Sequence, residues 1–308
     1  MKEIKHIYCF GTSFTAGGGF EFNKEYNYKL IALYQNLGIP LNQNNFSWPG
    51  LMQSLVKSNI KVHNLARCGY GNERVFRKTL DVIQDNYGNV DDSLFIFEFS
   101  GLGRKEYYLT ELDDYVICNY NFDEKTDNAK MHGVANTYFY QPDEITNIIN
   151  KNENMLSEFM EKTINFKNQH IIHERNMLLF ITFLEANNIN YLINGGIALN
   201  PKMGNTLPNN FSNKLLKFKD SDGKLGDFVR YFITHNLTLE DETRGVIKDG
   251  HCGYTGNKII SEMIYNQLID FGYIKQDKVE LTDYRTDFIF EPNGYTNETN
   301  FENVKIFL

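Results

Sequence analysis

The feature that most constrains the fold is the alternation of short apolar segments with segments of helical periodicity. Residues 4–10 and 94–99 are apolar almost throughout, which is typical of parallel strands buried on both faces. Further strands are predicted over 61–66 and 190–194, each ending in a polar or glycine-containing turn. Because strand–helix–strand connections cross over with one hand, this order predicts an α/β fold with a mainly parallel sheet and helices on both faces.

Helical segments fill the intervals between these strands. At 72–85 the apolar residues recur at helical spacing, and Pro49 suits the first turn of a helix running from Trp48 to about residue 58. The other helices are expected at about 28–37, 143–162, 168–186 and 255–271. Residues 101–165 are rich in Tyr, Asp and Asn and break the rhythm, and residues 282–308 match no repeating unit. We therefore expect one domain over 1–281 with an insertion near 101–165, followed by a C-terminal extension at 282–308.

The charge and hydropathy of the chain argue against nucleic-acid and membrane partners. The formal net charge of −8 argues against a nucleic-acid-binding surface, which needs clustered Lys and Arg. No stretch is apolar enough for a transmembrane helix, and the charged start of the chain is unlike a signal peptide. The four cysteines show no CxxC spacing. We expect no membrane partner and a protein that is cytoplasmic at synthesis, or virion-associated if the chain is viral.

Three polar turns follow three of the predicted strands. Ser13 follows the first strand, Gly69 the second, and the segment from Ser100 to Arg104 the third. Ligands of open parallel sheets bind at the carboxyl ends of the strands, so these turns are expected to form one site. Ser13 offers a nucleophilic hydroxyl and its own backbone N–H, and Gly69 can bring its N–H close to a substrate because it has no side chain.

A carboxylate and an imidazole occur together near the other end of the chain. Asp249 and His251 are two positions apart, directly before the last predicted helix. A serine nucleophile needs a base to take its proton, and the base needs a carboxylate to orient it. The residues Ser13, His251 and Asp249 therefore predict a catalytic triad.

These segments resemble the SGNH (GDSL-like) hydrolases. The run from Phe10 to Thr15 is similar to the family's first block, with Thr12 where an Asp usually precedes the serine. Residues 64–69 are similar to the second block, whose glycine contributes to the oxyanion hole, and residues 249–251 to the last block, which contains the catalytic Asp and His. Trp48-Pro49 and residues 69–74 are similar to SGNH-type proteins often encoded by bacteriophages. The resemblance implies a flavodoxin-like three-layer α/β/α fold and esterase, lipase or carbohydrate acetyl-ester hydrolase activity without metal or organic cofactor.

The third block departs from the family pattern. The family places an Asn after the third strand as an oxyanion donor, whereas residues 99–104 contain none. Three side chains could replace it: the Ser100 hydroxyl, the Arg104 guanidinium, and the amide of Asn72, which is the preferred substitute. Loss of one oxyanion donor costs roughly 3–4 kcal/mol of transition-state stabilisation in related chemistry.

Other motifs have weaker functional interpretations. His170 and His173 could share a helix face and bind metal, but they lack a third ligand and are better interpreted as structural. Residues 17–19 lack the Gly-Lys-Ser/Thr end of a phosphate loop, and residues 69–71 lack the third glycine of a dinucleotide fingerprint. Tyrosines of the insertion either stack on sugar rings or form its own small core, and the core is the better interpretation.

The sequence as a whole predicts an SGNH-type serine esterase. Its substrate would be an acyl ester, for example an acetyl ester, of a carbohydrate or a small molecule. The alternative is a viral structural or glycan-binding protein on the same scaffold with weak or no catalysis. In either case the extension at 282–308 could dock on a virion or on another copy of the chain.

Overall fold

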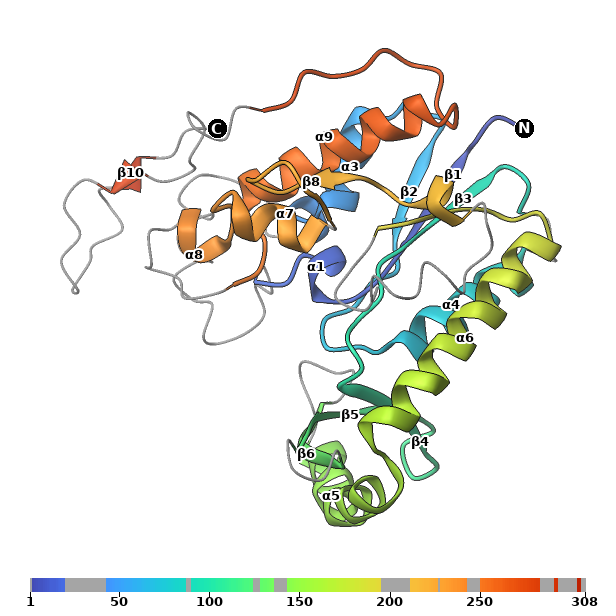
Figure 1. Ribbon diagram of the computed structural model, residues 1–308, viewed down its shortest axis with the longest axis vertical. Coiled ribbons are helices and arrows are strands. Elements are labelled where there is room, and N and C mark those ends of the chain that lie inside the picture. The colour runs from blue at the N-terminus through green and yellow to red at the C-terminus, as the bar shows by residue number, and fades with distance from the viewer. Residues whose placement is uncertain are drawn as a thin grey trace.

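A sheet of four parallel strands forms the centre of the protein (Figure 1). The computed structural model describes residues 2–19, 43–86, 90–123, 128–135, 143–194, 211–226, 228–242, 250–282, 291–292 and 304–305. The strands are β1 (His6–Phe10), β2 (Lys61–Asn64), β3 (Ser93–Phe97) and β7 (Asn190–Ile193), in the order β2-β1-β3-β7. The four predicted strands are therefore confirmed, and each lies close to its predicted bounds.

Alternation along the strands divides the apolar core between the two faces of the sheet. On one face Ile7, Cys9 and Ile96 pack with Trp48 and Ile260, which belong to α3 (Trp48–Leu55) and α9 (Tyr254–Asp270). The other face packs against α4 (Asn72–Asp85) and α6 (Phe166–Ala186) through Tyr8, Phe10, Phe95, Phe97, Val75, Met177 and Phe180. Helices thus flank both faces of a parallel sheet, as predicted, in an arrangement compatible with three layers.

The chain segments that follow β1, β2 and β3 stay side by side beyond the strands. The Leu65 N–H donates to Cys9 O at 2.8 Å, and the Arg67 N–H donates to Gly11 O at 3.1 Å. On the other side of β1, the Glu98 N–H donates to Phe10 O at 2.9 Å. These bonds extend the ladder to the carboxyl edge of the sheet and hold the three turns of the candidate site together.

The predicted helices within the described residues are also confirmed. Helix α4 has the predicted bounds, and α3 begins at Trp48 because the Ser47 side chain accepts a hydrogen bond from the Gly50 N–H. The shorter helical elements are α1 (Ser13–Ala16), α7 (Phe228–Thr234), α8 (Leu239–Glu242) and the 3₁₀ turns η2 (Gln43–Asn45) and η4 (Phe211–Lys214). The helix predicted at 28–37 lies outside the described residues.

The insertion contains more structure than the sequence predicts. Beside the expected helix, α5 (Asp143–Thr163), it forms an antiparallel sheet of β4 (Arg104–Leu109), β5 (Asp114–Phe122) and β6 (Ala129–Ala135). One face of this sheet packs on α5 around Val116, Cys118, Leu156 and Met160. Tyr107 and Tyr120 belong to this small core. The predicted helix is therefore confirmed, whereas the three strands were not predicted because they alternate apolar and polar residues too irregularly to be recognised.

Charged contacts join the insertion to α4. Arg77 pairs with Glu106 at 3.1 Å and lies over the Tyr115 ring at 4.0 Å. Lys105 pairs with Glu73 at 2.7 Å. The insertion therefore lies beside the amino end of α4, next to the turn that follows β2 (Figure 1).

The remaining described segments are short. Residues 218–226 form a hairpin of β8 (Phe218–Lys219) and β9 (Leu225–Gly226). In the C-terminal extension the structure describes β10 (Glu291–Pro292) paired with β11 (Val304–Lys305). In the described part of the chain, no helix combines the length and the apolar character that crossing a bilayer requires.

Candidate active site

Ser13 is the first residue of α1 and follows β1 by a turn of two residues. Its side chain is buried, and Gly17 ends the helix in the left-handed conformation, with φ of 79°. The next residue, Gly18, folds back so that its N–H donates to Ser13 O at 2.5 Å. A tight turn therefore holds Ser13 at the carboxyl edge of the sheet.

His251 lies next to Ser13 although 238 positions separate them in the chain. A Cβ atom added to Gly18 would lie 2.9 Å from Ser13 Cβ and 2.9 Å from His251 Nε2, so these two atoms border the same small space. The His251 ring also contacts Phe14, with ring centroids 5.0 Å apart. The structure thus brings together the predicted nucleophile and the predicted base.

Backbone contacts hold His251 from the other side. The carbonyl of His251 accepts a hydrogen bond from the Leu239 N–H at 2.7 Å, and Gly253 N–H donates to Leu237 O at 2.9 Å. These bonds fix the segment before α9 against the segment between α7 and α8. Asp249 lies outside the described residues, so its role as the orienting carboxylate stays a prediction.

Sequence reasoning missed Glu98, which follows β3. Its carboxylate is buried and accepts hydrogen bonds from the N–H and hydroxyl of Thr12, at 3.1 and 2.5 Å, and from the Thr15 N–H at 3.0 Å. Burial raises the pKa of Glu98, and the bonds from Thr12 and Thr15 act against that shift by favouring the carboxylate. The available signal was a single acidic residue in the apolar run 94–99.

Glycine is required where β1 ends. A Cβ atom on Gly11 would lie 2.5 Å from Glu98 Oε2 and 2.9 Å from the Thr15 hydroxyl oxygen. Any side chain at Gly11 would therefore push Glu98 out of its contact with the Ser13 turn.

A second set of contacts braces α1 from the opposite side. The indole N–H of Trp48 donates to the Thr15 hydroxyl at 3.3 Å, and the Asn64 amide donates to Thr15 O at 3.2 Å. The backbone N–H of Trp48 donates to the Asn257 side chain at 3.1 Å, which ties α3 to α9. The turn bearing Ser13 is thus held by Asn64 of β2, Trp48 of α3 and Glu98 after β3, and α9 supports it through Trp48.

The turn after β2 contains Gly69, which the sequence predicts as an oxyanion donor. Gly69 has φ of 83°, a left-handed conformation that favours glycine. Among the described residues, none beyond its chain neighbours comes within 4 Å of the position that its Cβ would take. The neighbouring Arg67 N–H bond to Gly11 O brings this turn alongside the end of β1.

The amide of Asn72 is engaged within the protein. Its oxygen accepts a hydrogen bond from the Ser100 N–H at 2.7 Å, and its nitrogen donates to Ser100 O at 3.0 Å. The same nitrogen lies 3.4 Å from His173 Nδ1. Asn72 therefore joins the start of α4 to the turn after β3, and this turn positions Ser100.

Arg104 lies at the start of β4 and lines a cavity of about 290 Å³ beside the Ser13 turn. Its guanidinium donates to Tyr70 O at 3.2 Å, and burial lowers its pKa. Thr12 and Phe14, the two neighbours of Ser13, line the same cavity, and so does Ser100. The predicted substitutes Ser100 and Arg104 thus both line a cavity that the two chain neighbours of Ser13 also line.

The histidine pair on α6 makes no metal site in the described part of the chain. His170 pairs with Glu174 at 3.2 Å, whereas His173 is buried against Asn72. No group of three metal-ligating side chains occurs among the residues that the structure describes.

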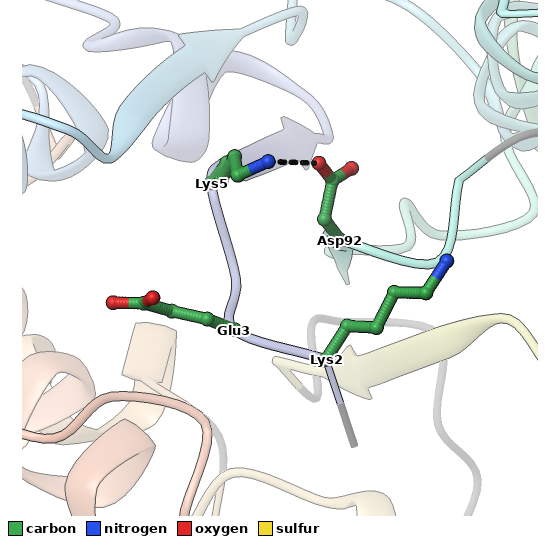
Figure 2. Close-up of a pocket in the computed structure, with 4 residues that line it drawn as sticks. All are labelled: Lys2, Glu3, Lys5 and Asp92. Atoms are coloured by element: carbon green, nitrogen blue, oxygen red, sulfur yellow. Dashed lines mark ion pairs between the residues drawn. The ribbon is translucent and has the colours of Figure 1, made fainter.

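A larger cavity, of about 400 Å³, lies at the opposite edge of the sheet. Figure 2 shows its lining residues, Lys2, Glu3, Lys5 and Asp92, with Lys5 and Asp92 paired at 3.4 Å. These residues precede β1 and β3, whereas Ser13 follows β1. This cavity is therefore remote from the candidate active site.

No family model matches the chain, and neither a curated protein nor a solved structure matches it.

Proposed function

We propose that this protein is a serine esterase of the SGNH type. The observation that supports this most directly is the approach of His251 Nε2 and Ser13 Cβ to the same point above Gly18. A hydroxyl beside an imidazole nitrogen is the arrangement that activates a serine for acyl transfer. We place the site at the carboxyl edge of a parallel sheet, where ligands of such folds bind.

The strand order gives further support. The order β2-β1-β3-β7 is that of the first four strands of a flavodoxin-like sheet, and the order reverses between β1 and β3. Ser13 follows β1 and Ser100 follows β3, so both lie at this switch point. We accordingly propose the flavodoxin-like three-layer form of the fold.

The proposed reaction has two halves. The Ser13 oxygen attacks the ester carbonyl while its proton passes to His251 Nε2, and the proton then leaves with the alcohol as the ester bond breaks. Water next attacks the acyl-serine, gives a proton to His251, and releases the carboxylic acid as Ser13 regains its proton. Asp249 would orient the imidazole. The chemistry fits a carbohydrate or small-molecule ester, for example an acetyl ester.

We propose that the backbone N–H groups of Ser13 and Gly69 are the first two hydrogen-bond donors to the oxyanion. The Asn72 amide was the preferred third donor, but its two bonds to Ser100 favour a positioning role for it. Ser100 and Arg104 remain candidates for the third donor because both line the cavity at Ser13.

The test is active-site labelling and hydrolysis. The native chain should react with a fluorophosphonate probe and hydrolyse p-nitrophenyl acetate, whereas Ser13→Ala and His251→Ala should do neither. Ser54→Ala, at an exposed position on α3, is the matched control and should behave as the native chain. Labelling and hydrolysis at the same background level in all four proteins would overturn the esterase proposal and favour the structural or glycan-binding alternative.

A further inference from the structure

The cavity beside the Ser13 turn has one charged residue, an arginine, in its described lining. Nine described residues line it, among them Ser100, Arg104, Asn119 and Asn121, and Arg104 is the only one of the nine that carries a charge. Among the described residues, its guanidinium donates a hydrogen bond to the neutral carbonyl of Tyr70. In the described part of the chain, no carboxylate lies within ion-pair distance of this half-buried guanidinium.

Glu98 forms no ion pair with Arg104. Both of its carboxylate oxygens accept hydrogen bonds from Thr12 and Thr15. Glu98 acts on Arg104 through space, raising its pKa against the larger opposite effect of burial. A guanidinium has five N–H donors in a planar fork that matches a carboxylate, and one carbonyl uses only one of them.

Polar side chains extend the same wall. Arg104 and Asn119 are directly paired in the β4–β5 ladder, so their side chains project from the same face of that sheet. The other end of the cavity is formed by Thr12 and Phe14 on either side of Ser13. A substrate with its ester at Ser13 would thus extend toward Arg104 and the amide of Asn119.

We propose that this cavity binds a carboxylate group of the ester substrate and that Arg104 is the residue that recognises it. The inference rests on the proposed esterase function and names its substrate class: an ester of a carboxylate-bearing molecule, such as an acidic sugar or a hydroxy acid. The insertion, through β4 and β5, would then determine specificity while the main sheet supplies the chemistry.

Two matched substrate pairs test the proposal. p-Acetoxybenzoate and its methyl ester place the charge on the alcohol side, and mono-p-nitrophenyl adipate and p-nitrophenyl hexanoate compare charge on the acyl side. The native chain should prefer the anionic member of one pair, and the pair identifies which side of the ester enters the cavity. Arg104→Gln should reduce that preference about tenfold or more, the usual loss when a charge-assisted hydrogen bond is removed. Arg230→Gln, which removes a guanidinium paired with Asp220, is the matched control and should keep the native preference for the anionic substrate.

A binding measurement separates this inference from the esterase proposal. Ser13→Ala cannot acylate, so calorimetric titration with p-acetoxybenzoate and its methyl ester reports recognition alone. If p-acetoxybenzoate binds more tightly than its methyl ester but neither the native chain nor any variant hydrolyses an ester, the carboxylate site is supported and the esterase proposal fails. If hydrolysis is observed without any preference for the anion, or with the same preference in Arg104→Gln, the carboxylate site is overturned.

A second measurement keeps the test valid if Arg104→Gln does not fold. Phenylglyoxal modification of Arg104 in the native chain, followed by peptide mass spectrometry, should be slowed by p-acetoxybenzoate and unaffected by its methyl ester. Equal modification with both compounds would contradict the proposal.

Discussion

The carboxylate of Glu98 holds Thr12, the residue directly before Ser13, through both the backbone N–H and the hydroxyl of that threonine. The position of the Ser13 turn therefore depends on an acidic side chain at the end of the neighbouring strand. Because Glu98 is buried, the bonds cannot be replaced by water without opening the sheet edge.

Replacing Glu98 by glutamine should weaken this support. Glu98→Gln keeps the shape, but the uncharged amide oxygen replaces the carboxylate oxygen that accepts from the N–H groups of Thr12 and Thr15, and the NH₂ group replaces the oxygen that accepts from the Thr12 hydroxyl. We expect the free energy of unfolding to fall by about 1–3 kcal/mol. We also expect kcat for p-nitrophenyl acetate to fall while KM changes little, because the nucleophile is displaced. Urea denaturation and steady-state kinetics measure the two effects, with the exposed Glu158→Gln as control. Native kinetics in Glu98→Gln would refute the positioning role.

Gly18 provides a steric test of the Ser13–His251 approach. In Gly18→Ala the new methyl group would lie 2.7 Å from His251 Cδ2 and 2.9 Å from Ser13 Cβ, closer than side chains normally pack. We expect fluorophosphonate labelling to slow at least about tenfold, since small displacements of catalytic groups are costly. The matched control is Gly250→Ala, next to His251, because no described residue other than its chain neighbours lies within 4 Å of a Cβ at that position. Equal labelling of both variants would argue against the proposed geometry.

The Arg77–Glu106 pair should stabilise the junction of the insertion with α4. The Glu106 side chain is only 2% exposed, so Arg77→Met leaves a buried carboxylate without its cation. We expect a loss of about 3 kcal/mol in the free energy of unfolding. Removing both charges in Arg77→Met/Glu106→Leu should restore part of it. The exposed pair of Lys151 and Glu111 is the control, and Lys151→Met should cost much less than Arg77→Met because solvent screens that pair. Similar decreases in the free energy of unfolding for Arg77→Met and Lys151→Met would contradict a special stabilising role of the Arg77–Glu106 pair.

Stability should fall on mild acidification because of His173. Burial lowers the pKa of His173 below its ordinary value of 6.5. Below that pH the unfolded chain takes up a proton that the folded chain does not, so the free energy of unfolding decreases by at most about 1.4 kcal/mol per pH unit for this group. The decrease ends once the pH passes the lower pKa of the folded state.

Urea denaturation at several pH values between 7.5 and 5 measures this slope. His173→Gln should flatten it. Burial also lowers the pKa of His63, so His63→Gln should flatten it as well, and the double variant should flatten it most. An unchanged slope in His173→Gln would show that His173 takes up its proton in the folded state.

The features predicted correctly from sequence are those determined by local pattern. Apolar runs such as 94–99 and the helical spacing of 72–85 identify their elements because burial on two faces, or on one helix face, leaves a regular signature. The position of Ser13 at the carboxyl edge of the sheet could be predicted because it directly follows a parallel strand. The approach of His251 was predicted from chemistry, since a serine nucleophile needs a base.

Features that depend on contacts between distant residues could not be predicted. Glu98 has no local signature beyond its charge, since its partners Thr12 and Thr15 lie more than eighty positions away. The bonds of Asn72 to Ser100 likewise depend on how the turns after β2 and β3 meet. The insertion's strands were missed because their apolar side pairs with α5, which follows them in the chain.

The buried indole of Trp48 gives the protein a built-in optical probe. The chain contains a single tryptophan, and its N–H contacts the Thr15 hydroxyl on α1. Its fluorescence therefore comes from one place, the wall of the turn that bears Ser13. A red shift of its emission at low denaturant concentration, before circular dichroism changes, would show that this turn opens ahead of the sheet that supports it.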